Sequence, residues 1–418
     1  MLSQQRVYRV LRVALAVSWV LPRYVWLLAR DGMGRPAGQP AWDLAHAAAA
    51  EEIRRVALAL AGAFTKAAQI GGARADILPE PFIDKLSQFH DAVPPRPFEA
   101  LGGIVERDLG RPLEQVFASV ETEALAAASL AQVHRAKLFD GSDVVVKIQY
   151  PEIRRIIPLD LGMLRRVAGL VQRLQRRIDI ASFVHEVTRF IALELDFERE
   201  VLATDRLRAV LRGFEGVRVP RVYHELCGPN VIVLEYLEGI QVTRTADLVA
   251  AGHKPADVAR RIGDLYGAMI FEIGFFHGDP HPGNLLVMQD GTIGLLDYGL
   301  CKELPKGFAR RVAQMMVSAL VGDSDAALEA AAALGFDTDA IQPDHLRSLL
   351  LMVIGDSDTD EGLLDILGES RLRRIPEDFA LVVRTLILLN GLSHRLAPRR
   401  RLVQGAVLER LAAGAAAA

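Results

Sequence analysis

Three polar residues in the second half of the chain could bind a metal ion together. Asp279, Asn284 and Asp297 lie in the segments FFHGDPHPGNLLV and LLDYGL, five and then thirteen residues apart. The residues between the last two predict two short strands around a turn at Gln289–Gly291, and a hairpin returns its two ends to one place. Carboxylate, amide and phosphate oxygens are the ligands that Mg²⁺ prefers. We therefore expect this segment to hold magnesium and nucleotide phosphates. An isolated HGD would instead suggest a loop whose polar residues only cap turns.

Protein kinases arrange their catalytic loop and metal ligands in this order, as H-x-D, Asn, a hairpin and D-F-G. In that scheme Asp279 orients or deprotonates the acceptor, while Asn284 and Asp297 bind magnesium. Tyr298 stands at the aromatic position of the last element. A kinase-like site also needs a lysine on an upstream strand, and DVVVKIQYP supplies Lys147. A solvent-facing lysine would be the ordinary interpretation of that strand if the downstream residues were absent.

The phosphate loop that should precede this lysine contains alanine in place of glycine. Glycine lets backbone N–H groups approach phosphates closely, whereas the Cβ of alanine resists the same conformations. We expect the loop to hold the nucleotide differently, through Ala126, Ala127, Ala128 and Ser129. The strand VIVLEYLEG should lead to the adenine edge, which makes Glu235 and Leu237 the candidates for backbone contacts.

A dense group of acidic residues occupies the segment ELDFERE. Its members are Glu194, Asp196, Glu198 and Glu200. Carboxylates this close on a helix repel one another, so we expect some of them to have a cationic or metal partner. This segment is also the best source of a helical glutamate to pair with the strand lysine Lys147. The alternative is a solvated acidic face that Arg199 and Arg206 offset.

The pattern along the chain predicts an α+β, bilobal protein-kinase-like fold with a helical N-terminal extension. Strands are expected on both sides of the turn Asp140–Asp143, and VRVPRVYHEL is expected to pair with NVIVLEYLEGI. We divide the chain into an Arg/Trp-rich amphipathic segment, a helical extension, an N-lobe and a C-lobe with an alanine-rich tail, at residues 1–43, 44–115, 116–238 and 239–418.

Composition and charge narrow the classes of function and location. The net charge of -3 gives no reason to expect nucleic acid as a partner. Cys227 and Cys301 cannot form a disulfide framework, which favours a cytoplasmic protein. No run of 18 uncharged apolar residues occurs, so the sequence predicts no certain membrane span.

The N-terminal segment RVYRVLRVALAVSWVLPRYVWLLAR combines arginine, tryptophan and apolar residues. This composition suits a helix lying in a bilayer interface. Pro22 and Arg23 interrupt the apolar run, which argues against a simple spanning helix. Two interpretations stay open: peripheral contact with the inner face of a membrane through residues 6–30, or packing on the protein's own body.

Taken together, these motifs resemble the AarF/UbiB family of atypical protein-kinase-like proteins, which is associated with coenzyme Q and other isoprenoid lipids. The resemblance rests on AAAS, AQVHRAKL, VVKIQYP, ELDFERE, FFHGDPHPGNLLV, LLDYGL and RTLILLNGLSHRLAP. It implies ATP and Mg²⁺ as cofactors, and an isoprenoid or quinone-type lipid and lipid-biosynthesis proteins as partners. The same resemblance implies that Glu200 is the helical partner of Lys147 and that Glu194 and Asp196 form an E-x-D signature. It also implies that Lys66 and Gln69 in TKAAQIGG face the nucleotide, with Ala68 where the family has glycine.

Three functions are consistent with these residues. The first is an atypical kinase or ATPase that supports ubiquinone or other isoprenoid-lipid metabolism, since the family's extension blocks a polypeptide acceptor. The second is a nucleotide-gated, lipid-binding pseudoenzyme, against which the intact lysine and metal positions argue. The third is an aminoglycoside- or choline-type phosphotransferase, because HGDxHPGN also occurs in those enzymes.

Overall fold

The computed structural model describes residues 2–72, 78–86, 89, 95–174, 180–338, 376–397 and 402–417. The chain divides into two compact units. The first unit comprises Met1–Phe197 and Tyr223–Val233, and the second comprises Glu198–Val222 and Leu234–Ala418. The chain therefore passes between the units three times, and each unit has a hydrophobic core of its own.

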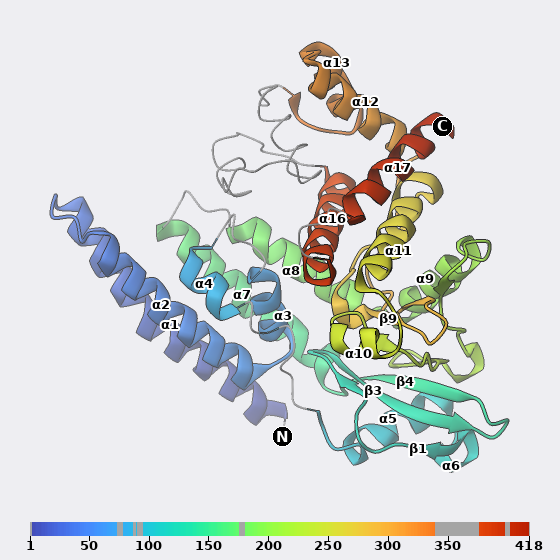
Figure 1. The fold of residues 1–418 in the computed structure, drawn as a ribbon. Coiled ribbons are helices and arrows are strands. Elements are labelled where there is room, and N and C mark those ends of the chain that lie inside the picture. Colours follow the sequence, from blue (N-terminus) through green and yellow to red (C-terminus); the bar gives the residue numbers. More distant parts are fainter. Residues whose placement is uncertain are drawn as a thin grey trace. The chain divides into compact units, whose positions relative to one another are not determined.

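Helices make up the beginning of the first unit. They are α1 (Leu2–Gly32), α2 (Gln39–Leu60), α3 (Ala63–Gly71), α4 (Glu80–Leu86), α5 (Glu99–Leu109), α6 (Leu113–Val116), α7 (Ile153–Leu174) and α8 (Ile180–Glu194). Figure 1 shows α1 and α2 alongside one another, where small residues such as Ala49 and Ala50 let the two backbones approach. The predicted helical extension is thus present, and it has a core of its own with α7.

The helix α1 runs unbroken through Pro22, the residue that interrupts the apolar run in the sequence. A proline inside a helix removes one backbone donor without necessarily ending the helix. By length and composition, Gln4–Gly32 and Glu377–Leu396 are each apolar enough to cross a membrane. Their buried shares are 11% and 44%, so the second helix resembles the core helix of a folded unit.

A buried ion pair fastens α1 to the rest of the first unit. Arg9 Nε lies 2.8 Å from Asp160 Oδ1 on α7, and Arg9 Nη1 donates to the Leu60 carbonyl at 2.6 Å. The Ala63 N–H at the start of α3 also donates to Asp160. Burial raises the pKa of Asp160 to about 6, because desolvation outweighs the opposing effect of Arg9. The ion pair therefore joins α1, α7 and the start of α3.

The sheet of the first unit has the strand order β1-β3-β4-β6, and β2 pairs with β3. The strands are β1 (Phe117–Val120), β2 (Ala126–Ala127), β3 (Ala131–Leu138), β4 (Asp143–Gln149) and β6 (Val231–Glu235). The predicted hairpin around Asp140–Asp143 is confirmed, with Val133 opposite Lys147. Val144, Val146 and Ile148 point into the core. Because side chains alternate along a strand, Lys147 lies on the other face.

The second unit is mainly helical. Its helices are α9 (Phe197–Val210, of which Phe197 belongs to the first unit), the 3₁₀-helix η4 (Pro282–Asn284), α10 (Thr245–Ala250), α11 (Pro255–Gly267), the π-helix η3 (Ala268–Ile273), α12 (Phe308–Val321), α13 (Ser324–Ala333), α16 (Glu377–Leu396) and α17 (Leu402–Ala417). Figure 1 shows α11, α16 and α17 side by side. The 3₁₀-helix η2 (His224–Leu226) belongs to the first unit, because Tyr223–Val233 is part of that unit.

Two small sheets in the second unit carry the polar loops. One has the order β5-β10-β9-β7 and the other pairs β11 with β8. Their strands are β5 (Val217–Arg218), β7 (Ile240–Gln241), β8 (Phe275–His277), β9 (Leu285–Val287), β10 (Ile293–Leu295) and β11 (Cys301–Glu303). The hairpin predicted around Gln289–Gly291 is confirmed as β9 and β10.

Among the residues that the structure describes, the predicted pairing of VRVPRVYHEL with NVIVLEYLEGI is confirmed only over one short antiparallel bridge. β5 in the first segment pairs in parallel with β10, and β6 in the second joins β4. At the bridge between Val222 and Leu234, the Tyr223 N–H donates to the Val233 carbonyl at 3.0 Å, and the Glu235 N–H donates to the Arg221 carbonyl at 2.8 Å. The regular strands of both segments pair with strands far away in the chain, and local patterning carries no information on such pairings.

Candidate functional site

The hairpin β9–β10 brings the predicted metal ligands together in the second unit. Leu285 lies opposite Leu295, and the Leu296 N–H donates to the Asn284 carbonyl at 2.9 Å. Asn284 and Asp297 therefore flank the open end of one hairpin. The Asn284 Nδ2 also donates to Asp279 Oδ2 at 3.0 Å. All three residues predicted from the sequence thus lie within one small part of the second unit.

Asp297 has a backbone conformation that few residues other than glycine adopt. Its φ is +58°, in the left-handed region that Asp and Asn tolerate best. The buried ring of His277 holds this turn, because its Nε2 contacts the carbonyls of Asp297 and Leu296 and its Nδ1 contacts Tyr266 Oη at 2.9 Å. Strained conformations of this kind gather at functional sites, where the surrounding structure keeps them in place.

The donor set fits magnesium that is shared with phosphate oxygens. The Asn284 amide nitrogen donates to Asp279, so its amide oxygen is the atom that can face a cation. Within the described ranges, no cluster of three or more His, Cys, Asp or Glu side chains is placed to hold a metal alone. Magnesium commonly binds one or two protein ligands together with substrate phosphates. Asn284 and Asp297 match that pattern, and they would hold the ion when a nucleotide is bound.

The helix α9 is fastened to the segment that follows Asp297. Arg199 donates to the Gly299 carbonyl at 2.8 Å and to the Cys301 carbonyl at 3.0 Å. The next residue, Glu200, is 2% exposed. Burial of a carboxylate is expensive unless it is paired, which supports a specific role for Glu200 over a solvated acidic face.

The candidate residues for the adenine edge, Glu235 and Leu237, can contact a nucleotide only through their backbone. The Glu235 carboxylate forms an ion pair with Arg218 and accepts the Arg221 N–H at 3.0 Å. The Glu235 N–H donates to the Arg221 carbonyl at 2.8 Å. A nucleotide contact at Glu235 would therefore use its carbonyl. Leu237 is buried, so a contact there would also involve its backbone.

The first unit contains the predicted lysine and the alanine loop. The Lys147 ammonium lies 5.4 Å from the centre of the Phe197 ring. Ala126 and Ala127 form β2, opposite Val133 and Gln132 of β3. The Ala128 N–H donates to the Ala131 carbonyl at 2.8 Å, and Ser129 is buried. The loop closes on its own hairpin, so the Ala128 N–H is committed within the protein, unlike the amides of a glycine-rich phosphate loop.

The two polar residues of TKAAQIGG make contacts within the first unit. Lys66 Nζ on α3 lies 2.6 Å from Glu194 Oε2 at the end of α8. The Gln69 Nε2 donates to the Phe89 carbonyl at 2.9 Å. The sequence predicted a cationic partner for the acidic segment, and Lys66 is that partner for Glu194. Ala68, at the position where the resemblance implies glycine, is buried on the opposite face of α3.

The sequence reasoning missed one cation beside Asp279. Arg384 Nη2 on α16 lies 3.6 Å from Asp279 Oδ1. Arg384 opens the stretch RTLILLNGLSHRLAP, which the resemblance included without assigning it a role. No signal in the sequence links this arginine to the loop, because the contact depends on how α16 packs.

The fold and the arrangement of Asp279, Asn284 and Asp297 define the chain as a kinase-like protein. Residues 88–331, more than half of the chain, match the ABC1 atypical kinase-like domain, and the chain belongs to that family. A solved structure of Rv3197 with erythromycin from Mycobacterium tuberculosis has the same fold, with a TM-score of 0.58 and 23% identity. The match covers 81% of this chain and 89% of that one.

Curated relatives carry kinase names. The chain is 30% identical over 363 residues to the chloroplastic protein ACTIVITY OF BC1 COMPLEX KINASE 7 of Arabidopsis thaliana, which covers 83% of this chain and 52% of the relative. It is 33% identical over 308 residues to AarF domain-containing protein kinase 1 of Xenopus tropicalis, which covers 72% of this chain and 58% of the relative. The chain therefore spans little more than half the length of these relatives.

Proposed function

We propose that this protein is an atypical kinase or ATPase that binds ATP with Mg²⁺ and supports ubiquinone or other isoprenoid-lipid metabolism. One observation carries the proposal: Asp279 and Asn284 are hydrogen-bonded, and Asn284 and Asp297 flank the open end of one hairpin. Bound magnesium would neutralise charge on the phosphate oxygens during phosphoryl transfer. Kinase names among the relatives support nucleotide chemistry.

In this proposal each polar residue of the site has a separate role. Asn284 and Asp297 hold the ion, and Asn284 also fixes the carboxylate of Asp279, which orients the acceptor oxygen or takes its proton. Lys147 binds nucleotide phosphates and Glu200 is its helical partner, as the resemblance implies. The ion pair between Lys66 and Glu194 keeps α3 against α8.

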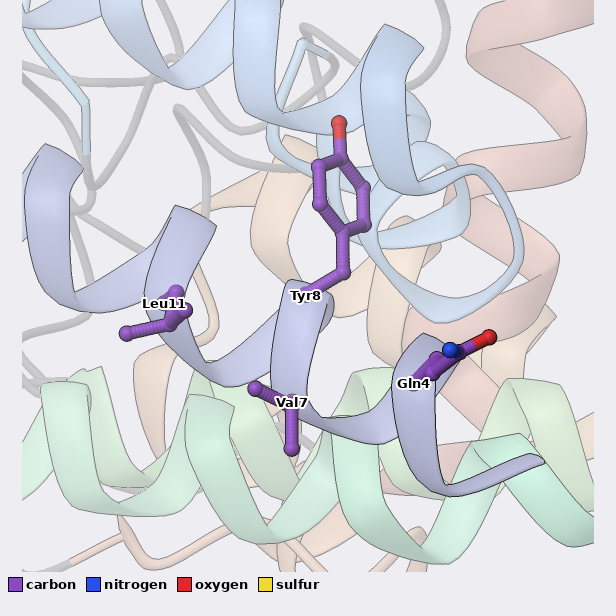
Figure 2. A pocket seen from close by; sticks show the side chains of 4 residues that line it. All are labelled: Gln4, Val7, Tyr8 and Leu11. Atoms are coloured by element: carbon purple, nitrogen blue, oxygen red, sulfur yellow. The ribbon is translucent and has the colours of Figure 1, made fainter. Parts of the chain in front are cut away.

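The lipid part of the proposal rests on the resemblance and on the surface of α1. Apolar side chains of α1 are exposed in a stripe: Val7, Tyr8, Leu11, Leu15, Trp19 and Trp26. Figure 2 shows part of this stripe, where Gln4, Val7, Tyr8 and Leu11 line a hollow of about 370 Å³. Arg23 and Arg30 lie over the rings of Trp19 and Trp26, at 3.6 and 5.3 Å from the ring centres.

The charge on α1 favours an anionic membrane as the partner of this stripe. The helix has no acidic residue before Asp31, and two of its five arginines, Arg9 and Arg12, pair with carboxylates of the protein itself. The other three, Arg6, Arg23 and Arg30, are the ones that can face anionic headgroups. Exposed tryptophans with arginine beside them suit the interface of a bilayer, where the ring lies at headgroup depth. These features support our proposal that the protein binds peripherally to the inner, cytoplasmic face of a membrane. An isoprenoid or quinone-type lipid and the proteins that make it would be its partners there.

Hydrolysis of Mg-ATP by the purified protein, with and without anionic liposomes, tests the function. Asp297→Asn is the control, because asparagine tolerates the same left-handed backbone but lacks the charge. We expect phosphate release by the wild type, faster release with liposomes, and none by Asp297→Asn. Nucleotide binding without turnover under any condition would refute the enzyme and favour a nucleotide-gated, lipid-binding pseudoenzyme.

A sedimentation assay tests the membrane surface separately. Trp19→Ser and Trp26→Ser together should release the protein from anionic liposomes. Val321→Ser is a matched control, since Val321 is also an exposed apolar residue, 73% exposed on α12. Equal sedimentation of both variants and the wild type would refute membrane contact through α1.

A further inference from the structure

One face of α16 contacts the loop that carries Asp279. Leu381, Arg384 and Thr385 are spaced three and four residues apart, which places them on one side of the helix. Thr385 Oγ1 donates to the Gly278 carbonyl at 3.3 Å. A Cβ at Gly278 would lie 3.5 Å from both δ carbons of Leu381. The helix therefore packs directly on the residue before Asp279.

A second contact fixes the same helix on the other side of the site. At the start of α16, Asp378 Oδ1 lies 2.9 Å from the Lys302 ammonium on β11. β11 follows the turn at Asp297 and pairs with β8, which leads into the loop of Asp279. The position of Arg384 is thus determined by contacts to the strands on both sides of the polar residues.

Arg384 and Asn284 contact the two oxygens of the Asp279 carboxylate. Arg384 Nη2 is 3.6 Å from Oδ1, and Asn284 Nδ2 is 3.0 Å from Oδ2. The arginine distance is longer than a charge-assisted hydrogen bond of about 2.7–2.9 Å. The side chains of Arg384 and Asp279 are 41% and 29% exposed, so both are partly open to solvent, although the Arg384 Nη1 atom itself is buried.

Stability alone is a poor explanation for this pair. An exposed ion pair typically contributes about 0–1 kcal/mol, and the long distance puts this one at the low end. A phosphoryl-transfer site, in contrast, needs positive charge where charge develops on the transferred group, and arginine often supplies it. A guanidinium has five N–H donors, so one group can approach both a carboxylate and a phosphate.

We propose that Arg384 binds the terminal phosphate of the nucleotide, with Asp279 as the group that orients it. The inference rests on the proposed function and adds a residue to the same site. In the transfer, the bond between the γ-phosphorus and the bridging oxygen of ADP breaks while a bond to the acceptor oxygen forms. The acceptor's proton goes to Asp279 or to solvent, and the guanidinium remains protonated throughout.

Binding of Mg-ATP and Mg-ADP to the whole protein tests this role, because only ATP has the terminal phosphate. We expect Arg384→Met to weaken Mg-ATP about ten-fold, the value of one charge-assisted contact, and to change Mg-ADP less than about two-fold. Arg384→Lys should recover part of the loss, since it keeps the charge but not the planar fork. Where the wild type turns over, kcat of Arg384→Met should fall by about 10²-fold or more.

Arg395→Met is the matched control, an exposed arginine on the same helix. It should bind both nucleotides as the wild type does. Thermal unfolding of each variant separates a lost contact from a lost fold. Equal weakening of Mg-ATP and Mg-ADP by Arg384→Met, or no weakening of either, would overturn the role of Arg384 while the proposed function stands. A wild type that binds neither nucleotide would overturn both.

Discussion

A methyl group at Gly278 should displace the loop of Asp279, because two backbone segments pass close together there. The Cβ of Gly278→Ala would lie 2.6 Å from the Leu300 carbonyl oxygen. Carbon–oxygen contacts are ordinarily about 3.3–3.6 Å, so the two backbone segments must part by about 0.7 Å or more. That movement also breaks the bond from the Gly278 N–H to the same carbonyl, now 3.1 Å long.

The magnitude follows from these two losses. Overpacking costs about 1–3 kcal/mol and a lost hydrogen bond about 0.5–1.5 kcal/mol, so we expect unfolding to become easier by about 2–4 kcal/mol. A displacement near 1 Å at a reacting group can lower turnover by about 10²-fold. The effect on turnover should therefore exceed what partial unfolding explains at low temperature.

Urea unfolding measures the expected loss in the free energy of unfolding, and Mg-ATP hydrolysis by the same preparations measures the expected loss of turnover. Gly391→Ala is the matched control, because its Cβ would meet nothing within 4 Å in the helix α16. Alanine should stabilise that helix by about 0.5–1 kcal/mol. If Gly278→Ala unfolded at the wild-type urea concentration and kept full activity, the close approach of the two segments would be wrong.

Three further predictions concern the first unit. Arg9→Met should lower the free energy of unfolding by about 3–5 kcal/mol at neutral pH, because it leaves Asp160 buried without its partner; urea unfolding measures this. The pKa of Asp160 is about 6 in the folded state against an ordinary 3.8, so its contribution to stability is present below pH 4 and is lost as the pH rises through 6. That loss is on the order of 3 kcal/mol. The dependence of the free energy of unfolding on pH between about 4 and 6 should therefore vanish in Asp160→Asn. A double-mutant cycle on Lys66→Met and Glu194→Gln should give a coupling of about 0.5–1 kcal/mol, since both side chains are about one-quarter exposed; a coupling of zero would argue against the ion pair.

The parts of the fold that could be predicted are those in which neighbours in sequence are neighbours in space. The hairpin β9–β10 is short, and its turn follows from Asp290 and Gly291, so Asn284 and Asp297 could be placed together without a structure. The same holds for β3 and β4, which put Lys147 on a strand.

The parts that could not be predicted depend on long-range packing. β5 has two residues and pairs in parallel with β10, a pairing that no pattern within Val217–Arg218 could indicate. The contact between Arg384 and Asp279 depends on how the α16 helix packs on the loop. Arg9 looked like one of several arginines on an amphipathic helix, and only its position opposite Asp160 distinguishes it.

The division of the chain has a consequence for how the protein folds as it is made. The strand β6 completes the sheet of the first unit beside β4, but it is synthesised after residues 198–222, which belong to the second unit. Until Val233 has left the ribosome, β4 has an unpaired edge, and open edges recruit other strands. Domains ordinarily fold in the order of their synthesis, N-terminal first. Here the first unit must wait for part of its successor, so a pause in translation at any point between Gln149 and Val231 would leave this edge of the nascent chain open to aggregation.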